Sequence, residues 1–137
     1  MRKIIVASHD KLADGMVKTL KFIGGERDNL FPLSAYGDNK PIDDQIKEIM
    51  ENVSEEDELV ILTDMVGGSV NQKFFSFKER PNTHIISGMN LPLALSIVLQ
   101  PEEDLLTADQ IKYLIKEGKD QVIYVNDYSV EVSEDDE

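Results

Sequence analysis

The residue best placed for chemistry is His9, which follows the first apolar run of the chain. Residues 4–7 are apolar and β-branched except for the last, which predicts a strand buried on both faces of a parallel sheet. The run stops at Ser8, His9 and Asp10, and a helical pattern begins at once. Ligands of open α/β sheets bind at the carboxyl ends of strands. A histidine that a rigid strand places there is therefore a candidate catalytic residue.

A carboxylate and a glycine-rich turn follow the third apolar run, residues 58–63. Asp64 comes directly after this run, and Gly67, Gly68 and Ser69 open a helical pattern. A carboxylate that accepts a hydrogen bond from one imidazole N–H leaves the lone pair of the other nitrogen free. Glycines at a helix N-terminus let backbone N–H groups approach an anion closely. Nucleophile, orienting carboxylate and anion cradle together suit phosphoryl transfer to a histidine nitrogen.

Strands and helices alternate along the chain. Apolar runs predict strands over residues 3–8, 29–34, 58–63, 83–87 and 121–125, with residues 128–132 as an optional extension of the last. Helices are expected between them, and the first carries Leu12, Met16, Leu20 and Ile23 on one stripe. The alternation predicts an α/β fold, a doubly wound and mainly parallel sheet with helices on both faces.

Local signals mark the ends of several elements. Gly24 and Gly25 stop the first helix and Gly118 closes the last. Pro32 predicts an edge position for the second strand. The residues expected to start helices are Asp10 as a cap, Asn90 as a cap with Pro92 in the first turn, and Thr107 with Gln110 as a capping box.

The strand order decides which loops meet. We expect the order 2-1-3-4, the common start of doubly wound sheets, which opens a crevice between the ends of strands one and three. That order places His9 near Asp64, with the turn 67–69 beside them and the loop 88–92 at the flank. The residues expected to line the site are Ser8, Asp10, Met65, Asn90 and Pro92.

Composition excludes several classes of function. The net charge of −13 over 137 residues argues against nucleic acid and against an anionic membrane surface, and it would steer a basic protein partner toward the chain. Solubility is an equally good reason for the acidity. The absence of cysteine excludes disulfides and thiol catalysis. With no secretory signal or membrane-length apolar stretch, we expect a cytoplasmic protein. We expect one domain over residues 1–130 and an acidic tail over residues 131–137.

Each candidate residue also has an ordinary structural interpretation. His9 could only hydrogen-bond within its loop, Asp64 could cap a helix, and Gly67-Gly68 could be a tight turn. His84 begins the fourth strand at the opposite end of the sheet, so we interpret it as structural and expect neither a zinc site nor any cofactor. The phenylalanines Phe74, Phe75 and Phe77 are expected in the core, while Tyr124 and Tyr128 suit either a dimer contact or ordinary strand packing.

Three segments together resemble a known family. Residues 4–9 (IIVASH), 64–71 (DMVGGSVN) and 87–92 (SGMNLP) resemble the signature loops of the enzyme IIA component of the mannose family, part of the bacterial phosphoenolpyruvate-dependent sugar phosphotransferase system. The order and spacing of the loops match, and the resemblance covers nearly the whole chain. It implies a homodimer with a four-stranded parallel core and an added antiparallel strand.

The same resemblance implies an activity. His9 would take a phosphoryl group from the histidine-containing phosphocarrier protein HPr and pass it to a histidine of the IIB component, with Asp64 as the carboxylate beside it. The chain departs from the family in two places, since Asp10 replaces a glycine and Val70 a proline. Asp10 adds negative charge near the incoming phosphate. The phosphoryl-donor subunit of dihydroxyacetone kinase shares the histidine loop but fits residues 67–69 less well.

Two other functions are compatible with parts of the pattern. A receiver domain phosphorylated on Asp64 would need an acidic pair after the first strand and a lysine after the fifth. Only Asp10 is present at the first place, and no lysine follows Val125 at the second. A sensor of the same fold would use phospho-His9 only to change partner binding. Failure to transfer the phosphoryl group to IIB would favour the sensor.

Overall fold

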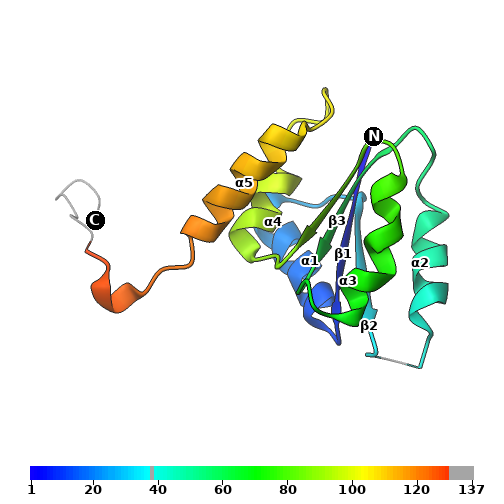
Figure 1. The fold of residues 1–137 in the computed structure, drawn as a ribbon, viewed down its shortest axis with the longest axis horizontal. Coiled ribbons are helices and arrows are strands. Elements are labelled where there is room, and N and C mark those ends of the chain that lie inside the picture. The colour runs from blue at the N-terminus through cyan, green and yellow to red at the C-terminus, as the bar shows by residue number, and fades with distance from the viewer. Residues whose placement is uncertain (38, 130–137) are drawn as a thin grey trace.

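A four-stranded parallel sheet forms the centre of the molecule (Figure 1). The computed structural model describes residues 1–37 and 39–129. The strands are β1 (Arg2–His9), β2 (Leu30–Ala35), β3 (Glu58–Thr63) and β4 (Thr83–Ser87). Their order is β2-β1-β3-β4 and every neighbouring pair is parallel, which confirms the predicted order and the edge position of Pro32.

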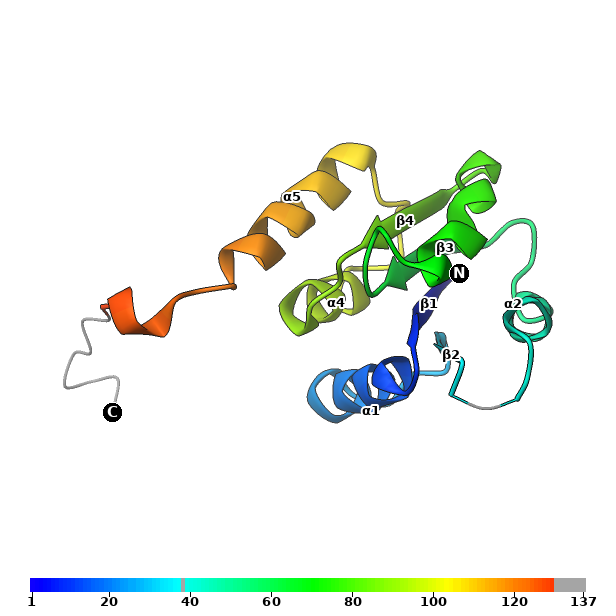
Figure 2. The same cartoon turned by 60° about the horizontal axis from the view of Figure 1, so that its bottom comes forward.

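Helices cover both faces of the sheet (Figures 1 and 2). They are α1 (Leu12–Gly24), α2 (Ile42–Met50), α3 (Ser69–Phe74), α4 (Leu91–Val98) and α5 (Ala108–Asp120), with short 3₁₀ turns at Phe75–Glu79 and Val125–Asp127. Side chains of α1, α4 and α5 pack on one face, and those of α2 and α3 on the other. Among the described residues, no helix is both long enough and apolar enough to traverse a bilayer.

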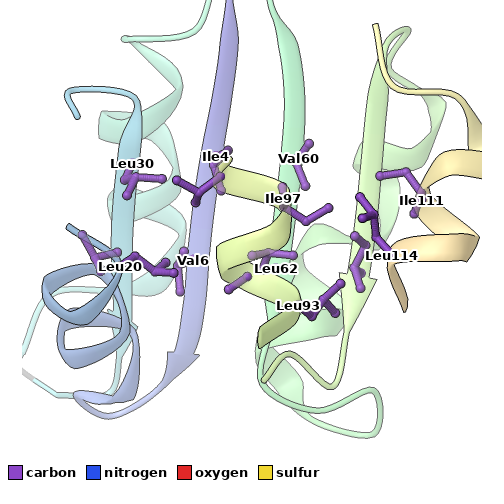
Figure 3. Close-up of a cluster of buried hydrophobic side chains, with 14 of the residues drawn as sticks. Ile4, Val6, Leu20, Leu30, Val60, Leu62, Leu93, Ile97, Ile111 and Leu114 are labelled. Atoms are coloured by element: carbon purple, nitrogen blue, oxygen red, sulfur yellow. The ribbon is translucent and has the colours of Figure 1, made fainter. Parts of the chain in front are cut away.

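The two cores follow from the two-residue period of a strand. Ile4 and Val6 of β1 face the core under α1, α4 and α5, which Figure 3 shows, while Ile5 and Ala7 face α2 and α3. Because both faces of the inner strands are covered, these runs are apolar without alternation. The buried inner strands form the rigid base from which the loops at the carboxyl edge emerge.

The buried stripe of α1 differs from the predicted one. Leu20 is buried and Met16 packs against the core as predicted, but Leu12 and Ile23 are more than half exposed, and Ala13 and Val17 are buried instead. The expected stripe followed the largest apolar side chains, but the turn after β1 rotates the helix so that small Ala13 meets the sheet. Phe75 is likewise 58% exposed rather than in the core, and the Lys78 ammonium lies over its ring.

The predicted fifth strand is not present in the described part of the chain. Residues 121–124 have no regular structure, Val125–Asp127 is a 3₁₀ turn, and Figure 1 shows this segment leading away from the sheet. A strand needs a hydrogen-bonding neighbour, and the segment meets none within the single chain. The optional extension 128–132 lies partly, and the acidic tail 131–137 wholly, outside the described residues.

Most of the predicted helix boundaries are present. Gly25 follows α1 with a φ of 93°, and Thr107 and Gln110 form the capping box of α5. Gly118 does not close α5, which continues to Asp120. A Cβ built on Gly118 would lie 2.8 Å from the Cβ of Leu93, so this glycine instead permits the close approach of α4 and α5.

Candidate functional site

The candidate site lies where β1 and β3 end side by side. Ala7 pairs with Thr63 in the sheet, so the next residues of each strand enter the same loop region. The backbone N–H of His9 donates to Oδ2 of Asp64 at 2.8 Å, and Nδ1 of the His9 ring lies 2.8 Å from the same oxygen. The expected contact between imidazole and carboxylate is therefore present.

Asp64 orients the ring and stays ionised. Its burial raises its pKa, but hydrogen bonds from the backbone and ring of His9 and from the Met65 N–H outweigh burial, so the pKa lies below its ordinary value. An ionised carboxylate only accepts, so the contact assigns a proton to Nδ1 of His9. Nε2 then carries the free lone pair of the neutral ring. The His9 side chain is 34% exposed, and among residues 1–37 and 39–129 no hydrogen bond involves Nε2.

Gly68 forms a wall of the site against the imidazole. An ideal Cβ on this residue would lie 2.7 Å from Cε1 and 3.5 Å from Nε2 of His9. The backbone of Gly68 is extended, with a φ of −87°, so glycine is required there by space rather than by backbone conformation. Gly67 has no atom within 4 Å of its ideal Cβ. Gly68 precedes Ser69, the first residue of α3, and Met65 is half exposed beside it.

The turn that carries Gly68 is tied to the sheet by Asn71. The Thr63 hydroxyl donates to Oδ1 of Asn71 at 3.0 Å, and the Asn71 amide donates to the Val66 carbonyl at 3.3 Å. These two bonds join the end of β3, the turn and α3. Asn71 belongs to the motif recognised in the sequence, but its role was not apparent from spacing.

Ser8, rather than Asp10, satisfies the start of α1. Ser8 is fully buried, and its hydroxyl accepts a hydrogen bond from the Ala13 N–H at 2.7 Å and donates to the Asp10 carbonyl at 3.1 Å. The cap expected from Asp10 is therefore wrong. Asp10 instead forms the left-handed turn between β1 and α1, with a φ of 49°, and its N–H donates to the Ala35 carbonyl at 2.6 Å.

The loop after β4 has no hydrogen bond to His9 among the described residues. Asn90 caps α4 as expected, by accepting from the Leu93 N–H at 2.9 Å, and its amide donates to the Gly118 carbonyl at 2.8 Å. Pro92 lies exposed in the first turn of α4. The Asn90 side chain is thus engaged with α4 and α5, and a role for Asn90 and Pro92 in lining the site stays a prediction.

Tyr36 is a site residue that the sequence interpretation missed. Its ring lies 5.8 Å from the His9 ring, centroid to centroid, and its hydroxyl is 2.9 Å from the Ser69 hydroxyl. Tyr36 follows β2, and Ala35 pairs with His9 in the sheet. The strand order therefore contained the signal, since it places the end of β2 beside the end of β1.

His84 lies at the opposite end of the sheet, as expected. Its Nε2 is 3.0 Å from the Leu106 carbonyl. Across the parts of the chain that the structure describes, no group of three histidine, cysteine or acidic side chains is placed to hold a metal ion.

Comparisons with known proteins agree with this fold. A family profile described as the PTS system fructose IIA component, where PTS denotes the phosphotransferase system, matches residues 3–113. A structure from Klebsiella pneumoniae, described as a phosphoenolpyruvate-dependent sugar phosphotransferase system permease, is 31% identical, with a TM-score of 0.83 and 92% of each chain covered.

Two further structures share the fold. One is a PTS IIA protein associated with the fucose utilization operon of Streptococcus pneumoniae, 22% identical, with a TM-score of 0.71 and coverage of 91% of this chain and 93% of that one. The other is a mannose/sorbose-specific IIA subunit from Enterococcus faecalis, 20% identical, with a TM-score of 0.71 and 97% of each chain covered. No curated protein sequence matches the chain.

Proposed function

From the premise that the chain belongs to the family of PTS fructose IIA components, we propose that it is a phosphohistidine carrier of sugar uptake. His9 accepts a phosphoryl group from HPr and passes it to a histidine of the IIB component. The observation that carries this proposal is the pair of contacts from His9 to Oδ2 of Asp64, which engage Nδ1 and leave the lone pair of Nε2 free. Such a nitrogen is a nucleophile in a defined orientation.

The transfer exchanges one nitrogen–phosphorus bond for another. Nε2 of His9 attacks phosphorus as the bond to the donor imidazole breaks, and the electron pair of that bond returns to the donor nitrogen. The proton on Nδ1 of His9 stays in its hydrogen bond to Asp64, which stabilises the positive charge that the ring acquires. Transfer to IIB is the same step with His9 as leaving group, so neither water nor a cofactor is consumed.

The turn 67–69 supplies the proposed anion cradle. Gly68 lets the His9 ring lie directly against this turn, because a side chain there would overlap the ring. Its own N–H points to the Met65 carbonyl at 3.3 Å, so Ser69, with its N–H and hydroxyl, is the principal donor we assign to phosphate, and Gly67 shapes the open turn. Donors arranged before the reaction stabilise the charge on the transferred group.

The acidic surface suits basic partners. A net charge of −13 would accelerate encounters with a basic carrier protein at low salt. Both proposed partners act in the cytoplasm, and we place the chain there with them.

A homodimer accounts for apolar side chains that this chain leaves uncovered. The exposed apolar and aromatic residues at the end of the described chain are Val122, Ile123, Tyr124, Val125 and Tyr128. β4 is an edge strand with no neighbour on its outer side in the described sheet. We propose that a second copy covers these features, and sedimentation equilibrium showing a monomer at micromolar concentration would contradict this.

Labelling tests the proposed function directly. Incubation with phosphoenolpyruvate, enzyme I and HPr should label the wild-type chain with an acid-labile, base-stable phosphate, and His9→Ala should take no label. His84→Gln is the matched control and should label normally, since this ring lies at the other end of the sheet. A His9→Ala variant that retains full label would end the proposal.

The second half of the reaction needs its own measurement. Purified IIB, added to the labelled protein, should receive the phosphoryl group. Label that stays on the chain would favour the sensor function instead. A hydroxylamine-sensitive label on Asp64 would favour a receiver domain, although Asp64 already accepts two hydrogen bonds from His9 and one from Met65.

A further inference from the structure

Tyr36 links the histidine to the anion cradle from the side of β2. Its ring lies 5.8 Å from the imidazole, with the two ring planes at 38°. Its hydroxyl lies 2.9 Å from that of Ser69, and Gly68, the neighbour of Ser69, abuts Cε1 and Nε2 of His9. Tyr36, His9 and the turn 68–69 thus form one continuous set of contacts around the nucleophilic nitrogen.

The backbone holds Tyr36 in a strained conformation. Its φ of 64° lies in the left-handed region, which bulky residues avoid. The residues on both sides of Tyr36 are close to the β1–α1 turn: the Asp10 N–H donates to the Ala35 carbonyl at 2.6 Å, and a side chain on Gly37 would place its Cβ 3.2 Å from Oδ1 of Asp10. Strain of this kind persists where the surrounding structure imposes it, and it clusters at functional sites.

We propose that Tyr36 is a positioning residue of phosphoryl transfer, acting on the phosphohistidine through Ser69. This inference rests on the proposed function. In the unphosphorylated protein either hydroxyl can donate to the other. A phosphoryl group on Nε2 brings close to two negative charges and three acceptor oxygens. Ser69 then donates its proton to a phosphoryl oxygen, and Tyr36 donates to Ser69 Oγ. No covalent bond changes in this relay.

The relay stabilises the phosphorylated form in two ways. A hydroxyl that accepts one hydrogen bond becomes a better donor in the next, so Tyr36 strengthens the bond from Ser69 to phosphate. The link also holds the Ser69 side chain in the rotamer that faces the cradle, while the tyrosine ring limits rotation of the imidazole. A purely structural link between the β2 loop and α3 would not strengthen the hydrogen bond from Ser69 to phosphate.

A double-mutant cycle separates a role of Tyr36 in phosphoryl transfer through Ser69 from a purely structural role. The variants are Tyr36→Phe, which keeps the ring and removes the hydroxyl, Ser69→Ala, and the two combined. The measured quantities are the rate of transfer from radiolabelled phospho-HPr and the hydrolysis half-life of the isolated phosphoprotein. Tyr113→Phe on α5 is the matched control, because its side chain is 62% exposed and on another element. Urea unfolding checks that each variant is folded.

We expect Tyr36→Phe to slow transfer and shorten the phosphoprotein half-life by about two- to tenfold, the range that one hydrogen bond contributes. In the Ser69→Ala background the same substitution should have no further effect, because Tyr36 acts through Ser69. Wild-type rates in Tyr36→Phe, or an equal loss in both backgrounds, would overturn the inference while leaving the labelling of His9 intact. A wild-type chain that takes no label on His9 would instead overturn the proposed function and this inference with it.

Discussion

The two ends of the sheet use similar residues for different purposes. Each end has a histidine and an aspartate whose pKa lies below its ordinary value. At the amino end, Nε2 of His84 is bound to the Leu106 carbonyl. At the carboxyl end, Nδ1 of the His9 ring and the His9 backbone N–H both contact the Asp64 carboxylate, and the side chain is 34% exposed. The two rings therefore differ in the partner that holds them, a backbone carbonyl for His84 and an ionised carboxylate for His9, and residue type alone does not reveal this difference.

The amino end is organised around a buried ion pair. Arg2 and Glu58, 2% and 4% exposed, are joined at 2.6 Å. The guanidinium also donates to the Gln100 and Asp104 carbonyls, and Glu58 accepts from the Leu106 N–H at 2.6 Å. These contacts fasten the loop between α4 and α5 to the sheet. Because the charged groups are buried and paired, this end is expected to serve stability.

The carboxyl end places left-handed residues beside an exposed imidazole. Asp10 and Tyr36, with φ of 49° and 64°, both lie next to His9, whereas Asn82, with φ of 54°, directly precedes β4 at the amino end. The comparison predicts that substitutions at the amino end change stability alone, whereas substitutions at the carboxyl end also change phosphoryl transfer. Four experiments test this separation.

Removing the charge of Glu58 should have the largest effect, and on stability alone. Glu58→Gln leaves the Arg2 guanidinium buried without its counter-charge, which costs roughly 3–5 kcal/mol of the free energy of unfolding. Urea unfolding measures the loss, and labelling of His9 per folded molecule should be unchanged. Combining it with Arg2→Met should restore more than half of the stability. A double variant as unstable as the single one would show that the ion pair is not the cause.

Gly68→Ala should disturb the carboxyl end by crowding the ring. The added methyl would lie 2.7 Å from Cε1 of His9, so the imidazole must move, at a cost of roughly 1–3 kcal/mol and a comparable loss in transfer rate. Imidazole nitrogen shifts in NMR spectra report the displacement. Gly67→Ala is the steric control, because it meets no atom within 4 Å and should leave stability and the ring signals nearly unchanged. Equal responses of the two variants would contradict the proposed wall.

Asp57 and Asp64 should both make the free energy of unfolding depend on pH in the acid range, but only Asp64 should affect phosphoryl transfer. Hydrogen bonding from the Ser54 N–H is the main cause of the low Asp57 pKa, and for Asp64 the hydrogen bonds from His9 and Met65 overcome burial. An aspartate whose pKa is lowered by folding stabilises the folded state at pH values above its unfolded pKa, which is about 4. This stabilisation is lost as the pH falls through the pKa of the folded state.

Asp57→Asn and Asp64→Asn should therefore each lower stability near pH 7, and the difference from wild type should narrow below about pH 4. Urea unfolding at pH 7, 5 and 3 measures this. Only Asp64→Asn should slow phosphoryl transfer, by about tenfold, since it alone orients the imidazole. Slowed transfer in Asp57→Asn would break the distinction between the two ends.

Asp10→Gly should have the smallest effect, and in the favourable direction. Glycine adopts the left-handed φ of 49° without strain, which should raise the free energy of unfolding by up to about 1 kcal/mol. Removing a negative charge near the incoming phosphoryl group should also speed transfer several-fold at low salt, with the gain shrinking as salt screens the charge. A slower Asp10→Gly variant would mean that the carboxylate assists the site.

Some features of this protein were readable from short stretches of sequence. The continuous apolar runs of β1 and β3 predicted inner parallel strands, and the pattern from Thr107 to Gln110 predicted the start of α5. The position of His9 and Asp64 after two such strands predicted their contact. Each of these depends on local geometry or on the one topological rule that orders the strands.

Other features required contacts between distant segments. Two of the four residues predicted for the stripe of α1, Leu12 and Ile23, are exposed instead, and Gly118 was assigned to a helix end although it serves packing against Leu93. The fifth strand was expected from the apolar character of residues 121–125, but a strand exists only beside a neighbour.

The sequence by itself determined the order of elements, the parallel sheet and the placement of an imidazole and a carboxylate at one edge. Only the tertiary structure decided which nitrogen of His9 is held, why Gly68 has no side chain, and that Tyr36 completes the site. The reason is physical: backbone propensities and apolar patterns act within a few residues, whereas these contacts depend on distances between side chains that β2, β1 and β3 bring together from separate parts of the chain.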